Sequence, residues 1–246
     1  MKDKVLDLPD TPEENDYVIA YIDLLGTKEL LSKSSESIVF GDIYYPFLIA
    51  GKIMPTMRDL KWDNIKIKIF SDNILIAHPV NDPKNKDDVY RAYKEVSNFL
   101  KFFLSMFANK GILFRGAITV DKLLINELMV WGKGLSAVVY LEENVAIYPR
   151  IIISEDLLKV FDSFELTGVD FEEKFSCLQD FDDCVFFDFF DYDDFESVES
   201  LLELTSEYIE KKIKAGASPR VMQKYRWFKN YIARAAEIYQ EIRQSV

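Results

Sequence analysis

Two carboxylates stand inside apolar segments of the chain, where an ionised side chain is costly to bury. Asp23 interrupts the run YVIAYIDLLG (17–26), and Asp72 lies in the break of the alternating segment IKIKIFSDNILIAHP (65–79). A buried carboxylate must be paired, protonated or bound to a metal. Two carboxylates at one sheet edge would form an oxygen site for Mg²⁺ or Mn²⁺, which usually also hold substrate phosphates. The alternative is that Asp23 caps a helix and Asp72 is an ordinary turn residue.

The segment after Asp23 carries groups that suit a phosphate. Gly26, Thr27 and Lys28 join a predicted strand to a predicted helix, so their backbone N–H groups would be free to hold phosphate oxygens. Arg115 begins the predicted strand FRGAITV and would add positive charge on the neighbouring edge. Its alternative role is a surface ion pair. A divalent cation, a helix N-terminus and a nearby basic side chain together favour a triphosphate.

Hydrophobic periodicity predicts the elements that would position these residues. The predicted elements are, in order, a strand at 17–26, a helix directly after Gly26, a helix at about 41–58, a hairpin at 65–79, a helix at 87–109, strands at 111–120 and 123–131, a helix at 133–143 and a strand at 146–154. Two long helices among sequential strands predict an α+β fold with a ferredoxin-like, split βαβ core. If the first strand is central and the hairpin lies beside it, Asp23 and Asp72 reach the same edge.

The chain divides into three predicted parts. Residues 1–16 form an N-terminal tail, 17–154 form the core domain, and 155–246 form a strand and helical appendage packed on the core. Within the appendage we predict a helix at 155–162, a strand at 184–190, and helices at 194–214 and 218–244.

The charge pattern restricts the classes of partner. The 246 residues carry a net charge of −12, of which −15 belongs to residues 155–203, whereas residues 17–154 carry +2. Long nucleic acids are therefore disfavoured, because binding them needs clustered Lys and Arg. A single metal-bound triphosphate in the nearly neutral core is compatible with these charges.

Other chemistries find little support in the sequence. His78 is the one histidine, which excludes histidine triads and histidine-rich zinc sites within one chain. Cys177 and Cys184 form neither a disulfide framework nor a zinc motif. The N-terminus has no apolar signal-peptide segment, and nowhere do eighteen apolar residues run together. We therefore expect a soluble, cytoplasmic protein with no membrane partner.

The motifs, taken in order, resemble those of class III nucleotidyl cyclases. YIDLLGTKEL is similar to the first metal motif of that family, FSDNILIA to the second, and FRGAIT to the strand whose Arg contacts the triphosphate. The block WGKGLSAVVYLEENVAIYPRI resembles the Gly-helix-Glu-Ala-Tyr-Pro-Arg pattern of the bacterial pyrimidine cyclases of Pycsar antiphage systems. CLQDFDDCVFFDFFD and KYRWFKNY are similar to the ends of such chains. The resemblance covers about residues 17–231.

This resemblance implies a fold, a reaction and a set of roles. It makes residues 17–154 the catalytic domain of a homodimer whose active sites lie at the subunit interface. Asp23 and Asp72 would bind two divalent cations (Mn²⁺ or Mg²⁺), with the Leu24 carbonyl as a further ligand. Arg115 would contact the phosphates and the Gly26–Lys28 turn would cradle them. The ribose 3′-OH would attack the α-phosphate and release pyrophosphate, and the cyclic product would be a second messenger sensed by a downstream effector protein in antiphage defence.

Departures from the family's pattern bear on the substrate. Lys68 matches a purine-reading lysine, but Met129 stands where its acidic partner would be and cannot accept a hydrogen bond from an adenine amino group in the same way. Ser136 and Tyr140 hold the positions of the family's Asn and transition-state Arg, and Arg150 is one candidate for the missing cation. These differences suit a pyrimidine substrate without distinguishing UTP from CTP. A purine cyclase and a degenerate, non-catalytic nucleotide-binding protein remain the alternatives.

Two further features receive structural interpretations. Asp121 stands where cyclases often have Gly, and we interpret it as a surface turn residue. The run at 180–196 has eight acids and no base, and alternates charge with Phe. We interpret it as a strand and loop with one solvated face rather than a metal site.

Overall fold

The computed structural model describes residues 13–27, 41, 44–49, 64–108, 110–190 and 195–245. Lys28 and most of the helices predicted between residues 28 and 58 lie outside this part of the chain. Within it, only the short helix α3 (Tyr45–Leu48) falls in the predicted 41–58 stretch.

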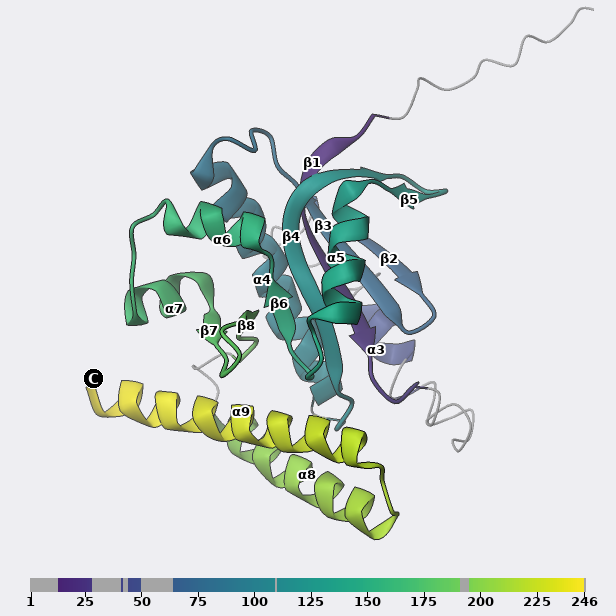
Figure 1. Cartoon of the computed structure of the whole chain (residues 1–246), viewed down its shortest axis with the longest axis vertical. Helices are drawn as coiled ribbons and strands as arrows, with labels where there is room; N and C mark the ends of the chain where they lie inside the picture. The colour runs from purple at the N-terminus through teal and green to yellow at the C-terminus, as the bar shows by residue number, and fades with distance from the viewer. Residues whose placement is uncertain are drawn as a thin grey trace, which may run out of the picture.

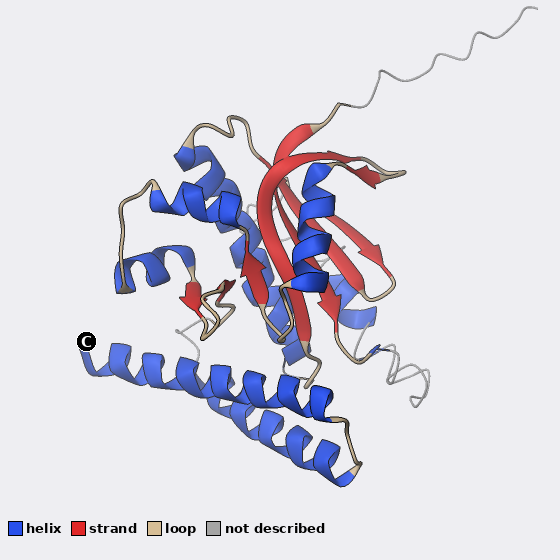
Figure 2. Ribbon diagram, viewed as in Figure 1, coloured by secondary structure: helices blue, strands red, loops and turns tan. Residues whose placement is uncertain are grey.

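A mixed sheet forms the centre of the molecule (Figures 1 and 2). Its strands are β1 (Asn15–Leu24), β2 (Lys66–Phe70), β3 (Asn73–Pro79), β4 (Phe114–Ile125), β5 (Val130–Trp131), β6 (Ile151–Ile153), β7 (Cys177–Gln179) and β8 (Val185–Phe187). The strand order is β2-β3-β1-β4-β6-β8-β7, and β5 pairs with β4 outside this path. Strand β1 is central and antiparallel to both β3 and β4. Because the first four strands run β2-β3-β1-β4 and are all antiparallel, the predicted ferredoxin-like core is confirmed.

Helices cover both faces of this core. Helix α4 (Lys86–Ala108) packs on β1 and β3, and α5 (Lys133–Asn144) packs on β1 and β4. Figure 1 shows α5 in front of the sheet and α4 behind it. Residues along β1 are therefore buried on both sides: Val18, Ile19, Ala20 and Ile22 are fully covered. A strand covered on both faces needs the nearly continuous apolar sequence that β1 has.

The sheet continues from the core into the segment after residue 154. Strand β6 is parallel to β4, and β8 and β7 extend the sheet beyond it. The remaining helices are α6 (Glu155–Asp162), α7 (Val169–Phe175), α8 (Phe195–Lys214) and α9 (Pro219–Ser245). Helices α8 and α9 pair with each other and cross below the end of the sheet in Figure 1. In the part of the chain that is described, no helix is both long and apolar enough to cross a bilayer.

Three predicted elements differ from the observed ones. The strands predicted at 111–120 and 123–131 are one long strand, β4, which ends at Ile125 because the Asn126 side chain accepts hydrogen bonds from the N–H groups of Leu128 and Met129. The strand predicted at 146–154 is confined to Ile151–Ile153, since the preceding residues form turns. Helix α7 and strand β7 were not predicted, because seven and three residues are too few to establish a helical or a strand periodicity.

Candidate functional site

The carboxyl end of β1 brings two of the predicted residues face to face. Asp23 is the second-last residue of β1 and is the register partner of Arg115 in β4 on one side and of Asn73 in β3 on the other. Directly paired residues of antiparallel strands have their side chains on the same face, about 5 Å apart. The central position of β1 therefore lets one carboxylate meet groups from both neighbouring strands.

Arg115 joins Asp23 to a third carboxylate. Its Nε donates to Asp23 Oδ2 at 3.1 Å, and its terminal nitrogen lies 2.6 Å from Oε1 of Glu142 in α5. The other terminal nitrogen donates to the Glu142 carbonyl oxygen at 3.3 Å. The side chains of Arg115, Asp23 and Glu142 are 19%, 18% and 6% exposed, so this ion-pair cluster is largely removed from water. The guanidinium is thus held in a fixed orientation at the edge of the sheet.

Glu142 was not among the predicted site residues. The signal for it was its spacing: Gly134, Val138 and Glu142 are the buried residues of α5 and lie four positions apart, on one side of the helix. That side packs on β1 and β4. A glutamate on a buried helical stripe needs a buried cation, and the nearest strand offers Arg115.

Asp72 approaches the same edge from the β2–β3 turn. Leu24 N–H donates to the Asp72 carbonyl oxygen at 3.0 Å, so the turn is bonded to the last residue of β1. The hydroxyl of Thr27 donates to Asp72 Oδ2 at 2.7 Å. Ser71 adopts a positive φ of 60°, which allows the tight two-residue connection between Phe70 and Asn73. Asp72 therefore lies at the same end of the sheet as Asp23, the end where β1 finishes.

The turn after β1 is shaped around the same carboxylate. Gly26 has φ +85°, a conformation that side-chain-bearing residues rarely adopt, and it lets the chain reverse so that Thr27 reaches back to Asp72. Thr27 is 5% exposed. Of the predicted Gly26–Lys28 phosphate cradle, the first two residues stand next to the carboxylate edge, and Lys28 lies outside the described residues.

Burial controls the ionisation of the cluster. Removal from water raises the pKa of Asp23, while the hydrogen bond and charge of Arg115 lower it and the neighbouring Asp72 raises it. Burial also raises the pKa of Glu142 to about 7, against the opposing charge of Arg115. The pKa of Tyr21 rises to about 12, by burial and then by the charge of Glu142 and Asp23. Desolvated carboxylates that resist ionisation gain more from an added cation than exposed ones do.

The donor set suits a cation that shares its ligands with a substrate. Within the described residues, no three His, Cys, Asp or Glu side chains are grouped so that they would hold a metal by themselves. Mg²⁺ needs no such cage, because it commonly binds one or two carboxylates together with substrate phosphates and water. Asp23 and Asp72 supply two carboxylates at one edge, which fits this mode; the Leu24 carbonyl as a ligand stays a prediction.

The predicted base-reading residues lie together on another part of the sheet. Lys68 pairs with Leu75 in β3, two positions from the partner of Asp23, and its Nζ donates to the Glu127 carbonyl oxygen at 3.1 Å. Met129, two residues beyond Glu127, is half exposed. The structure thus brings Lys68 near the turn that carries Met129.

Ser136 and Tyr140 occupy the exposed side of α5, one turn apart. Ser136 lies 3.5 Å from the Gly132 carbonyl oxygen, and Tyr140 is 63% exposed. Glu142 lies on the buried side of the same helix. Within the chain, therefore, Ser136 and Tyr140 face away from the cluster of Asp23, Arg115 and Glu142.

The placement of Arg150 does not support its predicted role as the missing cation. Its side chain is 0% exposed and forms ion pairs with Asp180 and Asp182, the latter at 2.6 Å. The hydrogen bond and charge of Arg150 lower the pKa of Asp182 to about 2. A guanidinium enclosed by two carboxylates is an internal structural group, because a ligand would have to displace both. We interpreted the acidic side chains of residues 180–196 as a solvated face, and this is wrong for Asp180 and Asp182, because both form ion pairs with the buried Arg150.

The other residues considered in the sequence are partly or fully buried. Asp121 is half buried in the middle of β4 rather than in a turn. His78 is buried, with Nδ1 2.9 Å from the Pro79 carbonyl oxygen, and burial lowers its pKa. Cys177 is buried and Cys184 partly buried, and both are free thiols. Burial raises the pKa of both thiols.

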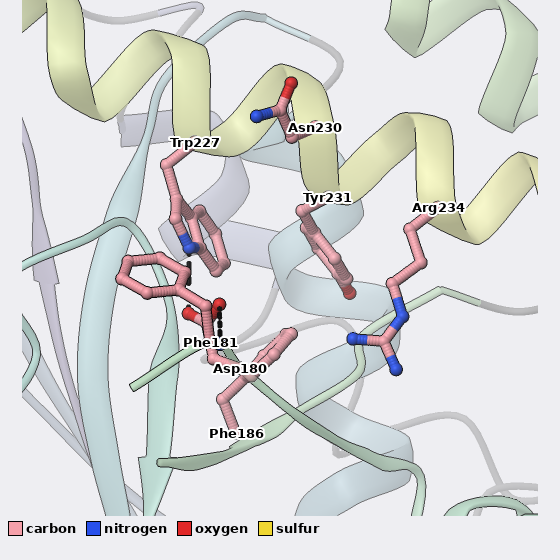
Figure 3. Close-up of a pocket in the computed structure, with 7 residues that line it drawn as sticks. All are labelled: Asp180, Phe181, Phe186, Trp227, Asn230, Tyr231 and Arg234. Atoms are coloured by element: carbon pink, nitrogen blue, oxygen red, sulfur yellow. Dashed lines mark hydrogen bonds between the residues drawn. The ribbon is translucent and has the colours of Figure 1, made fainter. Parts of the chain in front are cut away.

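A separate pocket lies between α9 and the β7–β8 region (Figure 3). It contains none of the predicted site residues. Its lining combines aromatic side chains with polar groups: Asp180, Phe181, Phe186, Trp227, Asn230, Tyr231 and Arg234.

Similarity to known proteins is low in sequence and partial in structure. No protein-family model matches the chain, and no curated protein matches its sequence. Among solved structures, the adenylyl cyclase CyaB from P. aeruginosa is 15% identical with a TM-score of 0.44, and the match covers 61% of this chain and 82% of that one. A bacterial light-regulated adenylyl cyclase is 14% identical, covering 71% and 90%, with a TM-score of 0.42. An adenylate/guanylate cyclase/hydrolase from Silicibacter pomeroyi is 14% identical, covering 71% and 95%, with a TM-score of 0.40.

Proposed function

We propose that this protein is a metal-dependent nucleotidyl cyclase, which converts a nucleoside triphosphate to its 3′,5′-cyclic monophosphate and pyrophosphate. One observation carries the proposal. Asp23 and Arg115 meet across β1 and β4, and the turn that carries Asp72 is bonded to the end of the same strand. An anionic site beside a fixed guanidinium matches the needs of a metal-bound polyphosphate.

In the reaction, the ribose 3′-oxygen bonds to the α-phosphorus, the bond from that phosphorus to the bridging oxygen breaks, pyrophosphate leaves, and the 3′-OH proton passes to solvent. Asp23 and Asp72 would hold two divalent cations (Mn²⁺ or Mg²⁺). When bound, these cations would lower the pKa of the 3′-OH and stabilise charge on the leaving group. Arg115 would bind phosphate oxygens, and backbone N–H groups at Gly26 and Thr27 would bind others.

Arg115 must change partners for this to happen. In this structure Arg115 donates to Asp23, the proposed metal ligand, and to the Glu142 carbonyl oxygen, and it forms an ion pair with the Glu142 carboxylate. A cation at Asp23 would compete for the same carboxylate oxygens, and Arg115 would then turn toward the phosphates. Glu142 would keep the other end of the guanidinium in place, which makes it a positioning residue.

We further propose a pyrimidine substrate, UTP or CTP. Support comes from the region where Lys68 donates to the Glu127 carbonyl beside Met129. A thioether accepts hydrogen bonds only weakly, so a base that needs a strong acceptor there, such as adenine, is disfavoured. The position of Lys68 suits a base with carbonyl oxygens.

A homodimer is the proposed assembly. Large apolar side chains are exposed on the β4–β5 hairpin and on α5: Leu128 is 95% exposed, Trp131 67% and Tyr140 63%. Exposed clusters of large apolar side chains commonly mark protein–protein contacts. In one protomer, Ser136 and Tyr140 face away from the edge that carries Asp23. A second copy bound on this side would bring its own Ser136 and Tyr140 toward that edge.

The biological role rests on the sequence resemblance alone. The product would act as a second messenger in antiphage defence and would be read by a downstream effector protein. Measuring cyclic UMP and cyclic CMP in cells that express the protein, before and after phage infection, tests this role separately from the chemistry.

The activity is tested by incubating the purified protein with UTP, CTP, ATP or GTP and Mn²⁺, and by measuring cyclic mononucleotide and pyrophosphate. We expect a cyclic product from a pyrimidine triphosphate and a loss of about 100-fold or more in rate for Asp23→Asn or Asp72→Asn. Asp121→Asn, on the same sheet and also partly buried, is the control and should keep its rate. Conversion of ATP or GTP alone would overturn the pyrimidine assignment, and an unaffected Asp23→Asn would overturn the metal site.

A further inference from the structure

Helix α9 carries a half-buried lysine, Lys224, on its core-facing side. Phe228, Tyr231, Ile232 and Ala235 are buried and follow the spacing of a helix side that packs on a core. Lys224 lies one turn before Phe228 and seven residues before Tyr231, so it belongs to the same side, and it is half buried. The row of side chains by which α9 packs on the protein therefore begins with Lys224 and continues through Phe228, Tyr231, Ile232 and Ala235.

The rotation of α9 about its axis is fixed by side-chain contacts. Trp227 Nε1 donates to Asp180 Oδ2 at 2.8 Å, a bond drawn in Figure 3. The hydroxyl of Tyr231 donates to Asp188 Oδ1 and accepts from the Phe189 N–H at 3.2 Å. Because these bonds lie within one turn of Phe228, the direction in which Lys224 leaves the helix is determined by the same packing.

The N-terminal part of this row lies near the end of the sheet that carries Asp23 and Arg115. The rings of Phe228 and Phe114 are 6.3 Å apart between centroids. Phe114 immediately precedes Arg115 and is the register partner of Leu24, which immediately follows Asp23. In Figure 1 the N-terminal half of α9 runs below the end of the sheet where β1 finishes and β4 begins.

Charges at this edge act on Lys224 and are affected by it. Burial lowers the pKa of Lys224, as do the positive charges of Arg115 and Arg220, while Asp23 and Glu142 raise it. In turn, Lys224 lowers the pKa of Asp23. The ammonium is thus electrostatically part of the cluster of Asp23, Arg115 and Glu142, although 109 residues of sequence separate it from Arg115.

We propose that Lys224 is a polyphosphate-binding residue of this site, supplied by the C-terminal helix. The proposal rests on the proposed function, because it assumes that the edge receives a nucleoside triphosphate. Tyr140 has no permanent charge, and Arg150 is enclosed by Asp180 and Asp182. Lys224 supplies positive charge from the same chain as Asp23, and its flexible stem lets the ammonium follow the phosphates as they bind.

The test uses inorganic tripolyphosphate with Mn²⁺ as the probe, since it has the phosphates without a base or a ribose. Binding is measured by calorimetry for the full-length protein, for Lys224→Met, for Lys224→Arg and for Lys229→Met. Lys229 is an exposed lysine on the same helix and is the control. A charge-assisted contact corresponds to about 10- to 100-fold in Kd. We expect that loss in Lys224→Met, a partial recovery in Lys224→Arg, and less than a twofold change in Lys229→Met.

Thermal unfolding shows whether α9 stays docked in Lys224→Met, and Lys224→Arg supplies a second variant if it does not. Unchanged tripolyphosphate binding in folded Lys224→Met would overturn the inference, as would an absence of binding by the unmodified protein. The proposed function fails separately, if the unmodified protein binds tripolyphosphate through Lys224 but cyclises none of the four nucleoside triphosphates.

Discussion

At the scale of single residues, the site is a cluster in which two carboxylates share one guanidinium. Asp23 and Glu142 both bind Arg115, and burial raises the pKa of each carboxyl group. One guanidinium cannot neutralise the charge of two carboxylates. This excess of negative charge favours a bound cation at the edge, and it makes the stability of the folded protein depend on pH.

The first prediction concerns Glu142. Its pKa rises from 4.5 in an unfolded chain to about 7, so between these values the folded protein binds the proton more tightly than the unfolded one. The free energy of unfolding should therefore fall as pH rises through this window, by at most about 3 kcal/mol. Glu142→Gln should lose this slope and be more stable than the unmodified protein at pH 8. Urea unfolding from pH 4.5 to 8 measures it.

The exposed neighbour provides the control for that experiment. Glu143 follows Glu142 on α5 and faces solvent, so Glu143→Gln should keep the original slope. An unchanged slope in Glu142→Gln would show that another group carries the pH dependence.

The second prediction concerns Arg150. Removing one partner of a buried ion pair leaves the other charge uncompensated, which costs about 3–5 kcal/mol. Arg150→Met leaves Asp180 and Asp182 without their cation and should lower the free energy of unfolding by that amount at pH 7, measured in urea. Arg234→Met removes an exposed arginine 3.8 Å from Glu172 and should cost less than about 1 kcal/mol. Equal losses in the two variants would contradict the structural role of Arg150.

The stabilisation by the ion pair of Arg150 and Asp182 is lost at low pH. Arg150 lowers the pKa of Asp182 from 3.8 to about 2. The stabilisation is therefore complete above pH 3.8 and is lost as the pH falls from 3.8 toward 2. In Arg150→Met this part of the acid dependence should disappear, which distinguishes loss of the ion pair from a general loss of packing.

At the scale of elements, the site depends on how closely β1 and β4 approach. A Cβ atom at Gly116 would lie 2.1 Å from the Tyr21 carbonyl oxygen in β1. The obstacle is backbone, so neither strand can avoid it by rotating a side chain. Gly116 directly follows Arg115, and the close approach therefore also sets the distance across which Asp23 and Arg115 meet.

The third prediction follows from this approach. Gly116→Ala should separate the two strands and lower the free energy of unfolding by about 3 kcal/mol, measured by urea unfolding. Gly41→Ala is the control, because a Cβ atom there would meet nothing within 4 Å. A loss below about 1 kcal/mol for Gly116→Ala would show that the strands tolerate a wider spacing.

Local patterns predicted the elements that carry strong periodicity. The apolar run of β1, the two-sided alternation around Asp72 and the long amphipathic α4 were recognisable because each signal lies within one segment. The Asp23–Arg115 and Asp72–Thr27 contacts join residues 92 and 45 positions apart, and only strand pairing brings them together. Glu142 and Lys224 were not predicted. The sequence does not show which strand each helix packs on, so the charged partners of these two residues could not be recognised.

At the scale of the whole molecule, the proposed homodimer depends on the exposed apolar side chains of the β4–β5 turn and α5. The fourth prediction is that Trp131→Glu places a charge in this interface and shifts the protein toward monomer in sedimentation velocity. The proposed cyclase activity should fall with it, while the thermal stability of the monomer changes little, since Trp131 is 67% exposed.

A matched control lies on another side of the molecule. Phe181 is 72% exposed and lines the pocket beside α9. Phe181→Glu should leave the oligomeric state unchanged. Dissociation by Phe181→Glu but not by Trp131→Glu would move the interface from α5 to the pocket side.

The contact between Phe228 and Phe114 has a consequence for the order in which the protein matures. Helix α9 is translated after every described strand, yet its ring packs against the residue next to Arg115. Strands β1 to β4 can pair on the ribosome while this aromatic surface is still uncovered. The packing around the edge at Asp23 is therefore complete only when the chain has been made past Phe228.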